Sequence, residues 1–169
     1  MPTDLPEPWL RGPLPGIDPM IAAVLFSFQQ ALEDLTKYTD GLTPRQMWER
    51  PHGLASAGSQ IRHIAGSVDR LLTYAEGRQL SDSQLAELRS EAEGTESREE
   101  LLAALRSRLE QAEARVRALD LRCLRETRGV GRKRLPTTLI GLLIHTAEHT
   151  QRHVGQAIVT AKIVRAMEK

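Results

Sequence analysis

Apolar residues at helical spacing, gathered in four separate segments, constrain the fold of this chain most. In each segment leucine, isoleucine, valine and alanine recur three or four positions apart, which places them on one face of an α-helix. The segments cover residues 18–41, 59–75, 97–119 and 136–164. Aromatic residues make up only 4% of the chain, and no strand-like run rich in Tyr, Phe and Thr is present. The sequence therefore predicts an all-α four-helix bundle with uneven connections.

Capping residues and helix breakers indicate where these helices begin and end. Asp18 followed by Pro19 is typical of a helix start, because the carboxylate accepts from free N–H groups and proline fits the first helical position. Gly41 is expected to end this helix. A short helix is predicted to begin at Thr43-Pro44, and another is expected over residues 81–93.

Residues 122–134 separate the third and last helices and are unusually basic. Two glycines interrupt the segment, so the sequence predicts an irregular connector, with the last helix beginning at Pro136 or Thr137. As a solvated loop, which we favour, the segment has no direct role. If it reaches a binding site, it would instead attract an anionic substrate. Its basic residues are Arg122, Arg125, Arg128, Arg132, Lys133 and Arg134.

The N-terminal segment is rich in proline and is predicted to lie outside the bundle. Six of the nine prolines fall within residues 1–19, and proline both fixes φ and removes a backbone donor. We therefore expect residues 1–17 to form an extended arm without helix, and residues 18–169 to form the helical domain. Trp9 and Leu10 are candidates to pin the arm to the domain surface or to a partner subunit.

Charge and cysteine content narrow the classes of partner. The net charge is +1, which gives no electrostatic argument for nucleic acid or an anionic membrane. Apolar stretches are interrupted well before the ~20 residues that a membrane span requires. Cys123 is the one cysteine, so an intrachain disulfide framework is excluded, and the N-terminus lacks the basic region of a secretory signal. We expect a cytoplasmic protein.

Three histidines recur every fourth residue in the last predicted helix, at positions 145, 149 and 153. Each step of four advances the side chain by about 400°, a drift of only ~40°, so all three point toward one side. Neutral imidazole nitrogens suit Zn²⁺, Ni²⁺ and similar ions. A single histidine is more often a hydrogen-bonded core or surface residue. These three, however, lie in the least polar helix of the chain.

His63 is the candidate for a further ligand, from the second long helix. Ile61, Ile64 and Val68 flank it, so its face is expected to lie near the bundle interior, and ligands from facing helices are how a bundle builds a metal site. His52 lies in a Pro-His-Gly loop and is predicted to be a surface residue. Three histidines with an open position for water are typical of catalytic metal sites.

Two segments of the chain resemble the DinB-like superfamily. They are Ser-Gln-Ile-Arg-His-Ile-Ala-Gly-Ser-Val-Asp-Arg-Leu-Leu at 59–72 and His-Thr-Gln-Arg-His-Val-Gly-Gln at 149–156. That family folds as a four-helix bundle with a histidine on the second helix. Its last helix carries His-x-x-x-His, then a small residue and Gln. Gly-Leu-Thr-Pro at 41–44 and Trp48 also resemble the loop after the family's first helix, so the similarity spans about residues 18–165.

The resemblance implies that His63, His149 and His153 bind a divalent transition metal, Zn or Ni first. His145 falls outside the family pattern, and it lies about 80° around the helix from His153, so we leave it out of the ligand set. Glu148 lies about 100° from His149, and the His-Glu-x-x-His motif of zinc proteases is absent. No catalytic residue is assigned.

Similar members of the family include metal-dependent thiol S-transferases and a maleylpyruvate isomerase, and many others have no established activity. The resemblance thus implies a metal-dependent enzyme that uses a low-molecular-weight thiol, and a homodimer. A thiol transferase would use the ion to lower the pKa of sulfur. A metal-dependent hydrolase, a non-catalytic metal-binding or stress-related module, and a bundle with purely structural histidines stay open alternatives.

Overall fold

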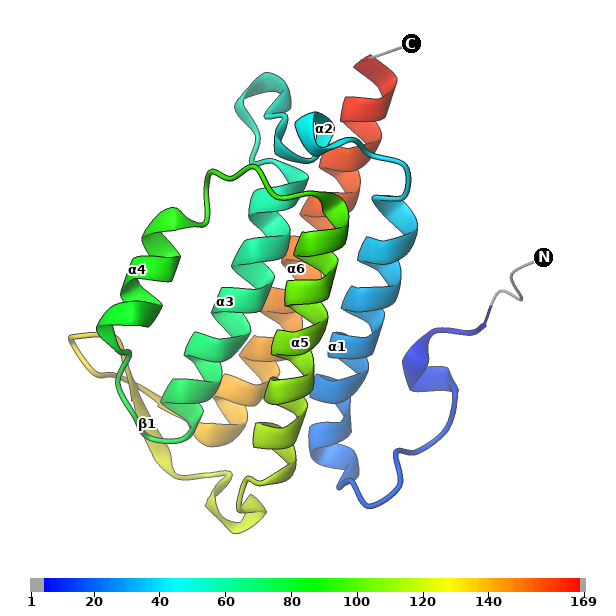
Figure 1. Cartoon of the computed structure of the whole chain (residues 1–169). Coiled ribbons are helices and arrows are strands. Elements are labelled where there is room, and N and C mark those ends of the chain that lie inside the picture. The colour runs from blue at the N-terminus through cyan, green and yellow to red at the C-terminus, as the bar shows by residue number, and fades with distance from the viewer. Residues whose placement is uncertain (1–4, 168–169) are drawn as a thin grey trace.

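Residues 5–167 are described by a computed structural model, and they form a four-helix bundle (Figure 1). The long helices are α1 (Pro19–Tyr38), α3 (Ala57–Ala75), α5 (Arg98–Arg117) and α6 (Leu139–Met167). Helix α6 packs between α1 and α3, and α5 completes the ring by contacting both of these helices. The predicted all-α bundle is therefore confirmed. Within the described residues, no helix is both long enough and apolar enough to cross a membrane.

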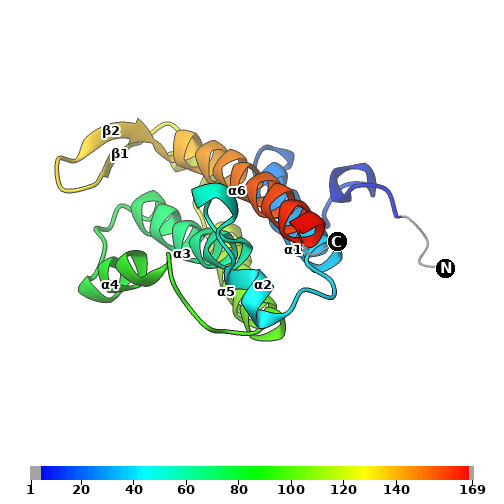
Figure 2. The same cartoon turned by 90° about the horizontal axis from the view of Figure 1, so that it is seen from above.

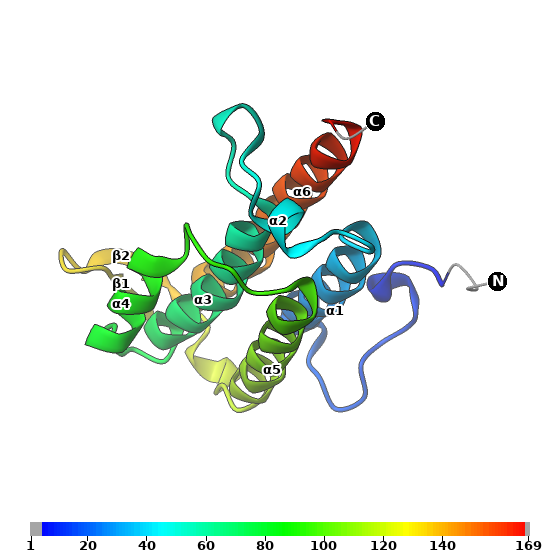
Figure 3. The same ribbon diagram turned by 45° about the horizontal axis from the view of Figure 1, so that its top comes forward.

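Short helices occupy the connections between the long ones. Helix α2 (Pro44–Trp48) and the 3-10 helix η2 (Pro51–Gly53) join α1 to α3, and α4 (Asp82–Ser90) joins α3 to α5. Helix α4 lies outside the ring, against α3 (Figure 3), and buries none of its own residues. It is nevertheless important for the site described below, because the residue that follows it points back toward α3.

Side-chain caps fix the helix starts. The carboxylate of Asp18 accepts from the Met20 N–H at the start of α1. Capping boxes begin α2 at Thr43, α4 at Ser81 and α5 at Ser97. Such caps contribute about 1 kcal/mol each, because they satisfy N–H groups that have no partner within the helix.

The core lies along the axis of the bundle and receives side chains from all four long helices. Each of these side chains is at most 2% exposed, and burying one stabilises the fold by roughly 1.5–3 kcal/mol. They include Leu25, Leu35, Ile64, Leu72, Leu105, Val116, Leu143 and Val154. The spacing of these residues in the sequence is what predicted the four helices.

The prediction of an irregular basic connector is wrong. After the 3-10 helix η3 (Leu121–Cys123), strand β1 (Thr127–Val130) pairs antiparallel with β2 (Leu135–Thr138), which places Val130 opposite Leu135. Helix α6 therefore begins at Leu139 and not at Pro136 or Thr137. The N–H groups of Leu139 and Ile140 donate to the carbonyls of Glu126 and Leu124, at 3.0 and 2.9 Å, so the base of the hairpin satisfies the first donors of α6.

The segment before α1 runs back along that helix (Figures 1 and 2). It was predicted to be without helix, but it contains a 3-10 turn, η1 (Pro8–Leu10). The guanidinium of Arg11 donates to both carboxylate oxygens of Glu33 on α1, at 2.6 and 2.7 Å. Trp9 and Leu10 remain 59% and 56% exposed. Residues 1–4 of the predicted arm lie outside the described residues.

Candidate metal centre

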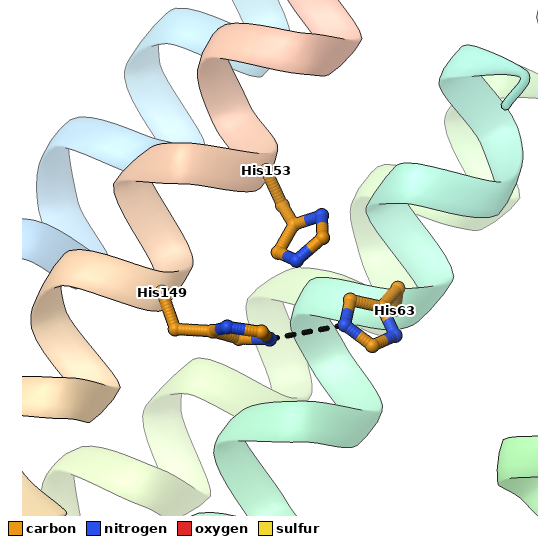
Figure 4. A group of neighbouring side chains, drawn as sticks. All are labelled: His63, His149 and His153. Atoms are coloured by element: carbon orange, nitrogen blue, oxygen red, sulfur yellow. Dashed lines mark hydrogen bonds between the residues drawn. The ribbon is translucent and has the colours of Figure 1, made fainter. Parts of the chain in front are cut away.

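His63, His149 and His153 meet where α3 packs against α6 (Figure 4). One ring nitrogen from each lies within 4.8 Å of the other two. The Nε2 atoms of His63 and His149 are 3.0 Å apart. Three nitrogens, each about 2.0–2.1 Å from one ion, require separations of this order. The structure therefore brings together the three histidines that the sequence singled out.

Helix geometry explains this convergence. His149 and His153 are one turn apart on α6, so their rings lie side by side and face α3. The adjacent residues Ile64 on α3 and Val154 on α6 are 0% and 2% exposed, which fixes the faces of the two helices. The three imidazoles are only partly buried. The cluster thus lies at the edge of the core, where a ligand can approach it.

Two neighbouring side chains set the orientation of the rings. The carboxylate of Glu91 lies 2.7 Å from Nδ1 of His63, and the side-chain carbonyl of Gln60 lies 2.6 Å from Nδ1 of His153. Both oxygens can only accept, so each Nδ1 carries a hydrogen and donates it. The Nε2 atoms of His63 and His153 then carry no hydrogen, and each has a free lone pair. This is the tautomer that binds a metal through Nε2.

The centre of the cluster holds more lone pairs than hydrogens. His63 and His153 donate their N–H groups to Glu91 and Gln60, so only His149 can place a hydrogen between the three rings. The other nitrogen of His149, the buried Nδ1, has no hydrogen-bond partner among the described residues. A divalent cation bound to the inward nitrogens of the three rings would satisfy their lone pairs together, so the donor set fits a metal ion.

The protonation state of the rings also favours metal binding. Burial, together with the charges that His153 and His63 would carry, lowers the pKa of His149 to about 4. Burial likewise lowers the pKa of His153. Both rings are therefore neutral near pH 7, as a metal ligand must be.

A buried ion pair between Arg70 and Glu91 holds the carboxylate that contacts His63. Arg70 Nη1 lies 2.6 Å from Glu91 Oε1, and both residues are 7% exposed. Burial raises the pKa of Glu91, but hydrogen bonds from His63 and Arg70 outweigh it and hold that pKa below its usual value. A Cβ atom at Gly66 would clash with Glu91 Oε1 and Arg70 Nη1. A side chain at position 66 would therefore displace the ends of this ion pair, which glycine leaves in place.

A cavity of about 260 Å³ opens beside the cluster, between α3 and α4. His63, His153 and Glu91 border it, and its other lining residues are small or uncharged: Ala55, Ser59, Gln60, Leu88 and Ala92. None of the described residues that line it comes from the basic segment 122–134. Arg128 from that segment instead donates to the carbonyl of Ala75 and pairs with Glu126. The basic hairpin thus contributes nothing to this cavity.

The other two histidines are not part of the group of three, although the ring centroid of His145 lies 5.2 Å from that of His149. His145 Nδ1 lies 2.8 Å from Glu148 Oε1, and its side chain is 45% exposed. Glu148 also pairs with Arg152, so it is tied to neighbours on its own helix. His52 is exposed, at a positive φ of 52° in η2. Leaving these three residues out of the ligand set agrees with where the structure places them.

The sequence of the chain also matches that of a known protein family. The sequence model of the DinB superfamily matches residues 27–157. The match covers well over half of the chain and includes all three clustered histidines. No curated protein matches the chain.

Proposed function

This chain belongs to the DinB superfamily, and we propose that His63, His149 and His153 bind one divalent transition-metal ion, Zn²⁺ or Ni²⁺ first. One observation carries the proposal. The three imidazoles converge, while Glu91 and Gln60 hold the outward nitrogens of two of them. Such partners fix the tautomer and orientation of metal-binding histidines. We also expect the protein to be a cytoplasmic homodimer. The proposed metal site depends on neither the compartment nor the oligomeric state.

The site has the features of a catalytic centre. Three protein ligands leave a coordination position open, and a bound ion would lower the pKa of a thiol or a water molecule there. The cavity beside His63 and His153 gives a small molecule access to that position. Leu88 from α4 and Ala92, which follows α4, form an apolar side of the cavity.

We favour transfer of a low-molecular-weight thiol as the activity. The lining of the cavity carries no cationic side chain among the described residues, which favours a small neutral group over an anion. Sulfur is also a soft ligand that transition metals accept. One observation favours a second candidate, a metal-binding module without turnover. Both carboxylate oxygens of Glu91 are engaged, by His63 and Arg70, so this carboxylate is not free to act as a general base.

Cobalt substitution distinguishes the two candidates. The Co²⁺-loaded protein should change its visible absorption when a small thiol is added, and a panel of thiols and electrophiles should reveal turnover. The His145→Ala variant serves as the matched control and should respond like the wild type. Without a thiol-dependent spectrum and without turnover, the transferase proposal fails and the non-catalytic module is favoured. If Co²⁺ does not bind at all, the metal site itself is wrong.

Gln60→Leu is expected to weaken metal binding by about 10–100-fold, which is typical when a residue that orients a metal-binding histidine is lost. Leucine has a similar size but cannot accept from His153 Nδ1. Competition with a chromophoric chelator measures the affinity, and circular dichroism checks the fold. Gln111→Leu, on the exposed side of α5, should bind metal like the wild type. Equal affinity in both variants would show that Gln60 does not orient His153.

A further inference from the structure

A second cavity, of about 490 Å³, lies where the N-terminal arm passes over α1 and α6. Its volume is within the range of small-molecule sites. It lies on the α1 side of α6, where the Gln151 amide donates to the Ser27 carbonyl at 2.9 Å, whereas the histidine cluster faces α3. Trp9 from η1 and Phe26 from α1 supply aromatic walls. This cavity is therefore separate from the metal centre.

The polar groups of this cavity are nearly all acceptors. The Gln30 amide donates to Asp34 at 2.8 Å, and the Ser27 hydroxyl donates to the Ala147 carbonyl at 3.0 Å. These bonds use the Ser27 hydroxyl and one N–H of the Gln30 amide, and the lining keeps several free acceptors. Gln30 Oε1 is buried without a hydrogen-bond partner among the described residues. The polar groups of this lining therefore favour a ligand that donates hydrogen bonds.

The charges of the lining also favour a ligand that donates hydrogen bonds and is positively charged. Its ionisable residues are three carboxylates, and Lys, Arg and His are absent from the described lining. Glu148 is already paired with Arg152. Glu7 accepts from the Trp9 indole N–H, and Asp34 accepts from the Gln30 amide. Within residues 5–167 neither Glu7 nor Asp34 has a cationic partner, so two negative charges at this cavity remain uncompensated.

We propose that this cavity binds a small organic cation, a primary ammonium that carries an aromatic group. The ammonium would donate to Asp34, and the aromatic group would lie between Trp9 and Phe26. Aromatic faces also attract cations directly. The ion pair between Arg11 and Glu33 joins the segment that carries Trp9 to α1, and Trp9 lines the cavity on that side.

Titration calorimetry with phenethylammonium tests the proposal against two probes of similar size, neutral 2-phenylethanol and anionic 3-phenylpropionate. The ammonium should bind saturably, and the other two should bind at least about tenfold more weakly, because each lacks the charge-assisted hydrogen bonds. Equal binding of the alcohol, or no saturable binding of the ammonium at millimolar concentrations, would overturn the proposal.

Variants locate the binding. Asp34→Asn should weaken phenethylammonium binding by about tenfold, whereas Glu110→Gln, an exposed acidic position on α5, should leave it unchanged. His149→Ala should also bind the ammonium normally, which separates this site from the metal centre. In Trp9→Phe the ligand-induced change in tryptophan fluorescence should vanish while calorimetry still detects binding. Unaltered affinity in Asp34→Asn would contradict the assigned site.

Discussion

Replacing His149 with alanine is expected to remove stoichiometric metal from protein purified without chelator. His149 contacts both other rings of the cluster, with Nε2 3.0 Å from Nε2 of His63 and its ring next to that of His153. Losing a direct ligand should cost more than the ~10–100-fold loss that follows removal of a residue that merely orients one. Elemental analysis measures the metal content. His63→Ala and His153→Ala should give the same result.

His145→Ala provides the matched control, because it removes the same side chain from the same helix two turns before His153. This ring is hydrogen-bonded to Glu148, is about half exposed and is not one of the three clustered rings, so the variant should retain a full equivalent of metal. Thermal unfolding of each metal-free variant separates loss of a ligand from loss of the fold. Full metal content in His149→Ala, or its loss in His145→Ala, would contradict the proposed ligand set.

Glu91→Ala is expected to lower the stability of the protein strongly, at the contact between α4 and α3. It leaves the Arg70 guanidinium, 7% exposed, without its carboxylate partner. Breaking a buried ion pair in this way costs about 3–5 kcal/mol, and we expect the lower end because α4 can move aside and admit water. Urea denaturation of the metal-free protein measures this cost without the contribution of bound metal. Metal affinity should also fall, because His63 loses its acceptor.

Two further variants show whether the unpaired charge is the cause. The double variant Arg70→Met with Glu91→Leu should be more stable than Glu91→Ala alone, because it leaves no charge without a partner. Glu87→Ala removes an exposed carboxylate 3.5 Å from Arg108, and it should change stability by less than about 1 kcal/mol. If Glu91→Ala unfolds at the same urea concentration as the wild type, the ion pair does not stabilise α4 against α3.

The helices and the histidines could be predicted from the sequence because both depend on local periodicity. Leu101, Leu105 and Leu109 predict one face of α5 without reference to any other element, and the interval between His149 and His153 does the same for α6. His63 could be identified because its neighbours Ile61 and Ile64 indicated that its face of the helix turns inward. These inferences need only the 3.6-residue repeat of a helix, whereas leaving His145 out of the ligand set also required the resemblance to the family's pattern.

Glu91 and Gln60 could not be identified in the same way. Glu91 follows a short, highly charged helix in which nothing distinguishes it from Glu87 or Glu93, and its partner His63 is 28 positions away in the sequence. Gln60 lies 93 positions from His153. The hairpin was missed because its strands have four residues each and contain Gly129 and Pro136, both of which disfavour strands.

The position of Glu91 links the histidine cluster to the least anchored helix of the bundle. Helix α4 buries none of its residues and is held to α3 by hydrogen bonds, among them those from the Gln84 amide to Asp69 and Thr73. Segments of this kind open locally at a lower free energy than global unfolding. Each opening would withdraw Glu91 from His63 and uncover one side of the cavity. Exchange of metal with solvent should therefore follow the opening rate of α4, while the four long helices remain folded.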